Sequence, residues 1–126
     1  MCLWTRQKEA KVAKKNITCY KIMLKYGKMV VSPYYASFVP AATLNGGLYS
    51  ACGSEHVEVS NVRVIVGGGF IHAYSDLNAA KEELARFNEW AHLYKCVIPA
   101  GTRYFRSIPE DHEICAKEIR FVEEVK

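Results

Sequence analysis

One stretch of this 126-residue chain places its apolar residues at helical spacing, whereas its other apolar runs are short. The stretch is SDLNAAKEELARFNEWA (75–91), and its apolar stripe consists of Leu77, Ala80, Leu84, Phe87 and Ala91. A spacing of three and four residues is typical of one face of an amphipathic helix. Ser75 or Asp76 can cap it by accepting a hydrogen bond from an early backbone N–H. The pattern predicts one main helix over 76–91, packed against a sheet.

Short runs rich in β-branched and aromatic residues fill the rest of the chain and are typical of strands. They are ITCYKIMLK (17–25), MVVS (29–32), LYSAC (48–52), HVEVSNVRVIV (56–66), FIHAY (70–74), the two halves of LYKCVIPAGTRYF (93–105) and EICAKEIRFVEEV (113–125). We therefore predict an α+β domain with a mostly antiparallel sheet of six or seven strands and one helix. We expect a basic N-terminal arm over 1–16 and a single domain over 17–126, whose first ordered element is 17–25.

Composition and cysteine spacing exclude several classes of protein. Half of the residues are apolar and 24% are charged, as in ordinary globular proteins. No apolar run is long enough to span a membrane, and the start MCLWTRQKEAKVAKK is not typical of a secretory signal. Five scattered cysteines without a CxxC pair, and four histidines without an HxxxH or HxH pair, favour reduced thiols in the cytoplasm. We expect no metal and no cofactor.

The positive charge is concentrated at the start of the chain. Residues 1–28 contain eight Lys or Arg and one acid, whereas the remainder contains nine basic and twelve acidic residues. A nucleic-acid-binding protein should also carry a basic face on its folded body. A solvated basic arm is therefore favoured, with binding to a phosphate backbone as the alternative, and sequence-specific nucleic-acid binding is not expected.

The sequence GGGFIHAY (67–74) looks like a phosphate-binding loop but lacks its spacing. Neither G-x-G-x-x-G nor G-x-x-x-x-G-K-[ST] is present, and a predicted strand separates the glycines from the helix. Gly67–Gly69 are therefore predicted to form a turn. His72 shares a strand face with Phe70 and Tyr74, and it is either a hydrogen-bonded structural histidine or a residue that contacts a ligand.

No arrangement of residues indicates catalysis, so we expect a binding protein rather than an enzyme and assign no catalytic residue. The chain has no G-x-S-x-G motif, and Cys96 and Cys115 lie in predicted strands, where thiols behave as small apolar groups. Tyrosines and arginines together favour binding of a nucleotide or another small anion, through stacking and bidentate phosphate contacts. The candidate ligand-binding residues are Arg103, Arg106, Tyr104, Tyr34, Tyr35, His72, Tyr74 and Arg63.

Several motifs follow one another from Met1 to about Phe105: MCLW, AKKNITCYKIM, SPYY, GFIHAY and CVIPAGTRYF. In their order and spacing they resemble small phage and prophage proteins of gut bacteria. The last strand, ICAKEIRFVEEV, departs from the tyrosine-alanine-serine step usual there. The resemblance implies a phage-type anti-defence protein in the cytoplasm of the bacterial host. By analogy with sponge inhibitors of Thoeris and CBASS, it would act as a homo-oligomer that binds a small (cyclic) nucleotide immune signal and sequesters it without cleavage.

Two alternatives remain. The protein could inhibit a host protein directly, through the long aromatic loop after 32 and through Trp90. The order of strands around one helix is also similar to ADP-ribosyltransferase folds, although no Q/E-x-E motif precedes a final strand. A degenerate domain of that kind is the second alternative.

Overall fold

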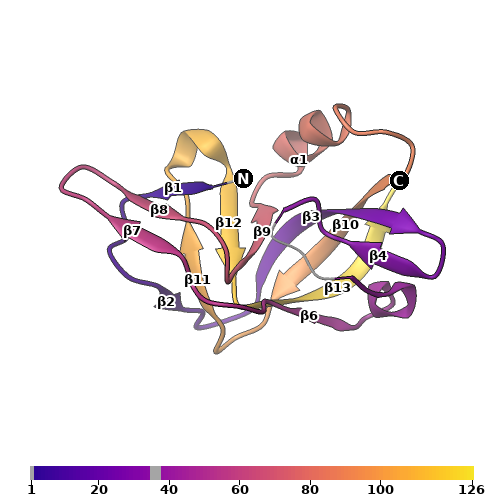
Figure 1. Cartoon of the computed structure of the whole chain (residues 1–126), viewed down its shortest axis with the longest axis horizontal. Coiled ribbons are helices and arrows are strands. Elements are labelled where there is room, and N and C mark those ends of the chain that lie inside the picture. Colours follow the sequence, from indigo (N-terminus) through magenta and orange to yellow (C-terminus); the bar gives the residue numbers. More distant parts are fainter. Residues whose placement is uncertain (1, 35–37) are drawn as a thin grey trace.

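The computed structural model describes residues 2–34 and 38–126, and Figure 1 shows one α-helix lying against a strongly bent set of strands. All strand pairs in the described part are antiparallel. The predicted α+β class with a mostly antiparallel sheet is therefore confirmed. The predicted number of six or seven strands is wrong, because the described residues form thirteen.

The strands are short and fall into two sheets. In chain order they are β1 (Leu3–Thr5), β2 (Lys11–Val12), β3 (Ile17–Tyr26), β4 (Met29–Val31), β5 (Val39–Pro40), β6 (Leu48–Ser50), β7 (Val57–Val59), β8 (Val64–Val66), β9 (Ile71–Tyr74), β10 (Ala91–Ile98), β11 (Arg103–Arg106), β12 (Glu113–Ala116) and β13 (Glu118–Val125). The main sheet has the order β2-β11-β12-β9-β3-β10-β13-β6, and β1-β8-β7 form a small second sheet. Two 3-10 turns, η1 (Ala41–Leu44) and η2 (Pro109–Asp111), complete the described elements.

Strand β3 is the centre of the main sheet and has three neighbours. Along one edge it pairs with β10 over eight residues, from Ile17 opposite Ile98 to Leu24 opposite Ala91. Its other edge is divided, because β9 pairs only at Tyr20 and β4 pairs from Leu24 to Tyr26. The sheet therefore branches in the middle of β3.

Both faces of the main sheet are covered by apolar residues. The largest cluster lies on one face and includes Cys19 and Met23 of β3. On the opposite face, α1 packs over Ile22, and the small sheet packs over Phe105 and Cys115. This double burial explains why the run 17–25 is apolar at both odd and even positions.

Two predicted strands are each divided in the structure, which accounts for part of the larger number. The run 56–66 is a hairpin of β7 and β8, whose turn is closed by the Ser60 N–H donating to the Arg63 carbonyl. The run 113–125 bends at Lys117, whose backbone N–H donates to Arg103 and whose carbonyl accepts from Ala51. Before the bend the chain pairs with β9 and β11, and after it the chain pairs with β10 and β6.

The expected first ordered element, 17–25, is preceded by two further strands. In the basic arm, β1 pairs with β8 and β2 pairs with β11. Leu3 is fully buried and belongs to the cluster between the two sheets. Thr5 and Ala13 are also buried, so strand pairing and several buried side chains anchor the arm on the body of the protein.

The helix is half as long as predicted. Helix α1 covers Leu77–Leu84 rather than 76–91, although Asp76 caps it as expected by accepting the N–H of Ala79 at 2.9 Å. After Leu84 the chain continues in turns, in which the N–H of Arg86 donates to the Glu83 carbonyl and Asn88 Oδ1 accepts the N–H of Trp90 at 3.0 Å. Residues 85–90 of the predicted helix are therefore not helical, and from Ala91 onward the chain pairs with β3. No helix in the described ranges has the length and apolar content needed to cross a bilayer.

Candidate functional site

A groove of about 640 Å³ lies beside β2, the strand at one end of the main sheet. We call it the basic groove, and it is lined by Lys11, Val12, Lys14, Lys15, Ile17, Tyr104 and Arg106. Four of these side chains are cationic and none is acidic. Cations without a neighbouring carboxylate create a positive potential that attracts anions.

Strand pairing brings the lining residues together. Lys11 is directly opposite Tyr104 in the β2–β11 pair, so both side chains lie on the same face of the sheet. Arg106 follows Tyr104 by two residues and therefore shares that face. The loop after β2 is fixed by Ala13, whose N–H donates to Thr102 and whose carbonyl accepts from Gly101.

The chemistry of the basic groove is that of a binding site for an anion with an aromatic part. Lys14, Lys15 and Arg106 are exposed, so their ammonium and guanidinium groups are accessible to phosphate. Tyr104 is partly buried against the main core and offers a ring for stacking. No His, Cys, Asp or Glu is among the lining residues, whose side chains are cationic, aromatic or aliphatic.

Arg103 and Arg106 lie on opposite faces of β11. They are three positions apart in the strand, and successive side chains of a strand alternate between its faces. Both guanidinium nitrogens of Arg103 donate to the Glu55 carboxylate, at 2.7 and 3.1 Å. These hydrogen bonds hold the pKa of the Glu55 carboxyl below its usual range. The structure thus brings Arg106 and Tyr104 to the groove and pairs Arg103 elsewhere.

Arg63 is also distant from the basic groove. It follows the β7–β8 turn, and its guanidinium carbon lies 4.6 Å from the ring centre of Trp4 in β1. Trp4 is 39% exposed, so this cation–π pair lies at the surface.

Tyr34 and Tyr74 form a separate pair near α1. A hydrogen bond joins their side chains, and burial raises the pKa of both phenols. The ring of Tyr34 also makes an edge contact with Phe87, at a centroid distance of 6.5 Å. Tyr35, the remaining candidate from the same loop, lies outside the described residues.

His72 is fully buried in β9, and its Nε2 lies 2.7 Å from the carbonyl oxygen of Gly67. Burial lowers the pKa of His72 to about 4, so the ring is neutral at pH 7 and donates its Nε2–H to that carbonyl. The geometry is that of a structural histidine that fixes the preceding turn.

The glycines at 67–69 form the predicted turn, and their small size serves packing. Gly69 has a φ of +82°, and a Cβ there would lie 2.6 Å from the Cα of Glu55. His56 donates its N–H to the carbonyl of Gly68 and accepts from Gly67, so the loop before β7 lies directly on the turn. The backbone of Glu55 and His56 therefore packs closely on this turn.

The most unusual polar residue, Lys21, escaped the sequence analysis. It is fully buried in β3, and its Nζ donates to Ser32 Oγ and to the His72 carbonyl, both at 2.6 Å. The Tyr34 ring lies 5.1 Å from the same nitrogen. Burial lowers the pKa of Lys21 to about 7. A lysine in the middle of an apolar strand, between Cys19 and Met23 on the same face, is the sequence signal that marks it.

The lysines of the arm were expected to be solvated, and the structure gives three of them a place in the basic groove. The excess of seven positive charges in residues 1–28 is the sequence signal that could have indicated this cationic site.

Among residues 2–34 and 38–126, no group of three or more His, Cys, Asp or Glu could hold a metal ion. Comparisons with protein-family models, with curated proteins and with solved structures give no match.

Proposed function

We propose that this protein binds a small phosphorylated nucleotide in the basic groove and sequesters it without cleaving it. The observation that carries the proposal is a set of four cations around the Tyr104 ring with no carboxylate among them. Phosphate oxygens would bind Lys14, Lys15 and Arg106, and the base would stack on Tyr104. The lack of catalytic side chains in the groove supports binding over cleavage.

The biological role that we propose is anti-defence. The motifs that resemble phage proteins and the accessible cationic groove together support capture of a (cyclic) nucleotide immune signal in the cytoplasm of the bacterial host. A sponge of this kind is expected to be a homo-oligomer, and light scattering of the purified protein measures its mass directly.

A thermal-shift screen against NAD, ADP-ribose variants and cyclic di- and trinucleotides tests the proposal. At a ligand concentration 100 times the dissociation constant, binding stabilises the folded protein by about 2.7 kcal/mol. The ligand should be recovered unchanged after denaturation of the protein. Arg106→Ala and the double variant Lys14→Ala/Lys15→Ala should abolish the shift, whereas Lys28→Ala, an exposed lysine outside the groove, should retain it.

No shift with any nucleotide, or a shift that the groove variants retain, would contradict the proposal. Conversion of NAD to a product would favour the ADP-ribosyltransferase-like alternative instead.

A second candidate function is direct binding of a host protein, and a specific surface favours it. The rings of Phe38 and Trp90 lie 6.3 and 5.6 Å from that of Tyr26, and all three side chains are 44 to 58% exposed. Exposed aromatic residues that contact one another are typical of interface anchors. Binding of a host protein that Trp90→Ala abolishes and Arg106→Ala retains would support this function over the first.

A further inference from the structure

The basic groove is the first of four hollows, each of which shares a lining arginine with the next. Arg106 also lines a hollow of about 190 Å³, bounded by Arg6 after β1 and by Pro109 in η2. Arg6 in turn lines the next hollow, of about 210 Å³, together with Lys8 and Arg63. Arg63 also lines the fourth, of about 430 Å³, beside β7 and β8. We call the four hollows together the basic track.

Specific hydrogen bonds hold the segment that carries Arg6 and Lys8 on β11. Thr5 Oγ1 donates to the Arg106 carbonyl at 2.6 Å, and the Arg106 N–H donates to Gln7 Oε1 at 2.7 Å. The N–H of Ile108 donates to the Trp4 carbonyl at 2.9 Å. The middle of the basic track is therefore a fixed part of the fold.

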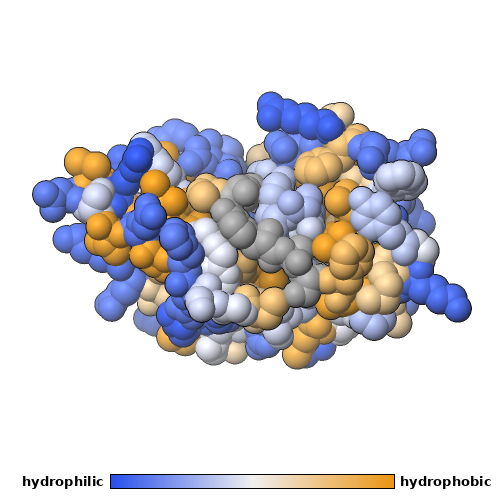
Figure 2. All heavy atoms as spheres, viewed as in Figure 1, coloured by the Kyte–Doolittle hydropathy of each residue, from blue (hydrophilic) through white to orange (hydrophobic). Residues whose placement is uncertain are grey.

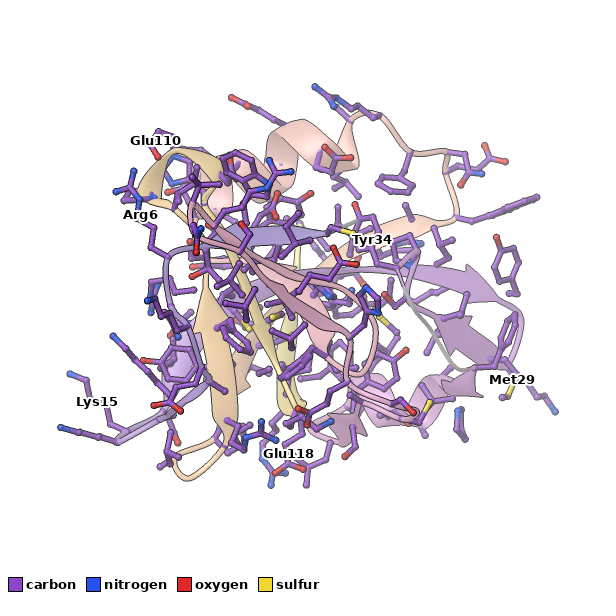
Figure 3. All side chains as sticks on the ribbon, turned by 60° about the vertical axis from the view of Figure 1, so that its left-hand side comes forward. Arg6, Lys15, Met29, Tyr34, Glu110 and Glu118 are labelled. Carbon is purple, nitrogen blue, oxygen red and sulfur yellow. The ribbon has the colours of Figure 1, made fainter. Side chains whose placement is uncertain are left out.

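Cationic side chains line the first three hollows of the basic track without a carboxylate among them, whereas the fourth holds one arginine and one glutamate. Its positive side chains are Lys11, Lys14, Lys15, Arg106, Arg6, Lys8 and Arg63. The acidic side chain among the lining residues of the four hollows is Glu58, at the far end, which lies 3.2 Å from His56. Figure 3 shows Arg6 and Lys15 projecting away from the ribbon on the same side of the view.

Aromatic rings accompany both ends of the basic track. Tyr104 lies in the basic groove, and Trp4 lies under the Arg63 guanidinium near the other end. Figure 2 shows hydrophilic side chains interspersed with apolar ones at the end of the molecule that carries β1, β7 and β8. A row of cations with an aromatic ring near each end suits single-stranded nucleic acid, whose phosphates repeat and whose bases stack.

We propose that the basic track binds single-stranded nucleic acid, with phosphates on its cations and bases on Tyr104 and Trp4. This inference rests on the proposed function for its first hollow and extends the ligand from one nucleotide to a strand. Binding should depend little on base sequence, because the rings offer stacking rather than contacts to base edges. A flat membrane would meet the projecting side chains but would leave the hollows unfilled.

Fluorescence anisotropy with labelled oligo(dT) and oligo(U) of 2, 4, 8 and 16 nucleotides tests the proposal. Affinity should rise with length until the basic track is filled and then level off. Arg6→Ala/Lys8→Ala should weaken binding of the 16-mer at least tenfold and leave binding of the dinucleotide unchanged. Lys14→Ala/Lys15→Ala should weaken both ligands, and Lys28→Ala/Lys81→Ala, with two exposed lysines outside all four hollows, should weaken neither.

The salt dependence supplies a second measurement. The slope of log K against log salt is about −0.7 for each phosphate neutralised on a single strand. Arg6→Ala/Lys8→Ala should therefore make the slope for the 16-mer smaller by one unit or more, and the charge-conserving Arg6→Lys/Lys8→Arg variant should restore it.

Different negative results distinguish the proposal for the basic groove from the proposal for the basic track. A 16-mer whose affinity and salt slope are unaffected by Arg6→Ala/Lys8→Ala would overturn the basic track while the basic groove stands. Binding of mononucleotides without any gain from length would do the same. Absence of binding by every ligand would overturn both. Equal competition by vesicles with anionic lipids, or by a polyglutamate peptide, would overturn the assignment to nucleic acid.

Discussion

The Arg103 guanidinium binds the Glu55 carboxylate through two parallel hydrogen bonds, Nη1 to Oε2 at 2.7 Å and Nη2 to Oε1 at 3.1 Å. The Lys117 ammonium lies 3.2 Å from the same carboxylate and also donates to the Gly69 carbonyl. This network connects β11, the bend between β12 and β13, and the loop before β7. Arg103 therefore stabilises the fold on the face opposite the basic groove.

Glu55→Gln should separate the structural role of Arg103 from ligand binding. The amide keeps the shape of the carboxylate and removes its charge, and both partners are a third to a half exposed. We expect a loss of about 0.5–1 kcal/mol in the free energy of unfolding, measured with urea. Affinity for a ligand of the basic groove should remain unchanged. A large change in that affinity would mean that Arg103 reaches the ligand.

Gly69→Ala and Gly53→Ala form a matched pair for the close approach at the glycine turn. Both residues have a positive φ, +82° and +84°, but an added Cβ meets the backbone of residues 54–55 only at Gly69. Gly53→Ala should cost about 1 kcal/mol from backbone strain alone. Gly69→Ala should cost at least about 2 kcal/mol more, because overpacking adds to that strain. Equal losses in thermal or urea unfolding would contradict the packing argument.

Lys21 should make stability depend on pH above neutrality. Its pKa is about 7 in the folded protein and near 10.5 in the unfolded chain, so between these values the unfolded chain binds the additional proton. The contribution of Lys21 to the free energy of unfolding should therefore rise from pH 7 to pH 10, by up to about 4 kcal/mol. Urea unfolding across this range, compared with Lys21→Met, isolates the effect. If the free energy of unfolding changes with pH in the same way in the wild type and in Lys21→Met, the prediction is wrong.

Glu113 should give the opposite dependence at lower pH. Burial raises the pKa of its carboxyl from 4.5 to about 7, and its Oε1 is buried without a hydrogen-bond partner in the described part of the chain. The folded protein thus holds the additional proton between these values, and its stability falls as pH rises through them. Glu113→Gln should remove this loss, which is up to about 3 kcal/mol. The free energy of unfolding of Glu113→Gln, minus that of the wild type, should therefore be larger at pH 8 than at pH 4.

Local patterns in the sequence predicted the elements whose shape is set by neighbouring residues. The β3–β4 hairpin, with Gly27 at a φ of +63° and Tyr26 opposite Met29, joins the predicted strands 17–25 and 29–32. The cap at Asp76 and the turn at Gly67–Gly69 were predicted as well. Each of these features depends on a few consecutive residues, so one sequence was sufficient.

The features that were missed depend on residues far apart in the chain. The helix ends at Leu84 and the chain then pairs Ala91 with Leu24, a partner that periodicity around 75–91 does not reveal. The placement of Lys11 beside Tyr104 depends on the register of two strands more than ninety residues apart. The separation of Arg103 from Arg106 could have been predicted, since alternation along a strand puts them on opposite faces.

The branch in β3 has a consequence for how the protein opens. Strands β9 and β4 pair with the same edge of β3 and diverge from each other there. The Lys21 ammonium connects the two strands, because it donates to the His72 carbonyl in β9 and to Ser32 Oγ just after β4. The described parts of the segment from β4 to η1 are held to the body by the three-residue β3–β4 pair, by the Lys21 amine, and by Val30 and Leu44 in the main core. Hydrogen exchange should reveal this segment as a separate cooperative unit, which opens at a lower free energy than β3 and β10. In Lys21→Met this unit should exchange faster still, while the β3–β10 amides keep the rate set by global unfolding.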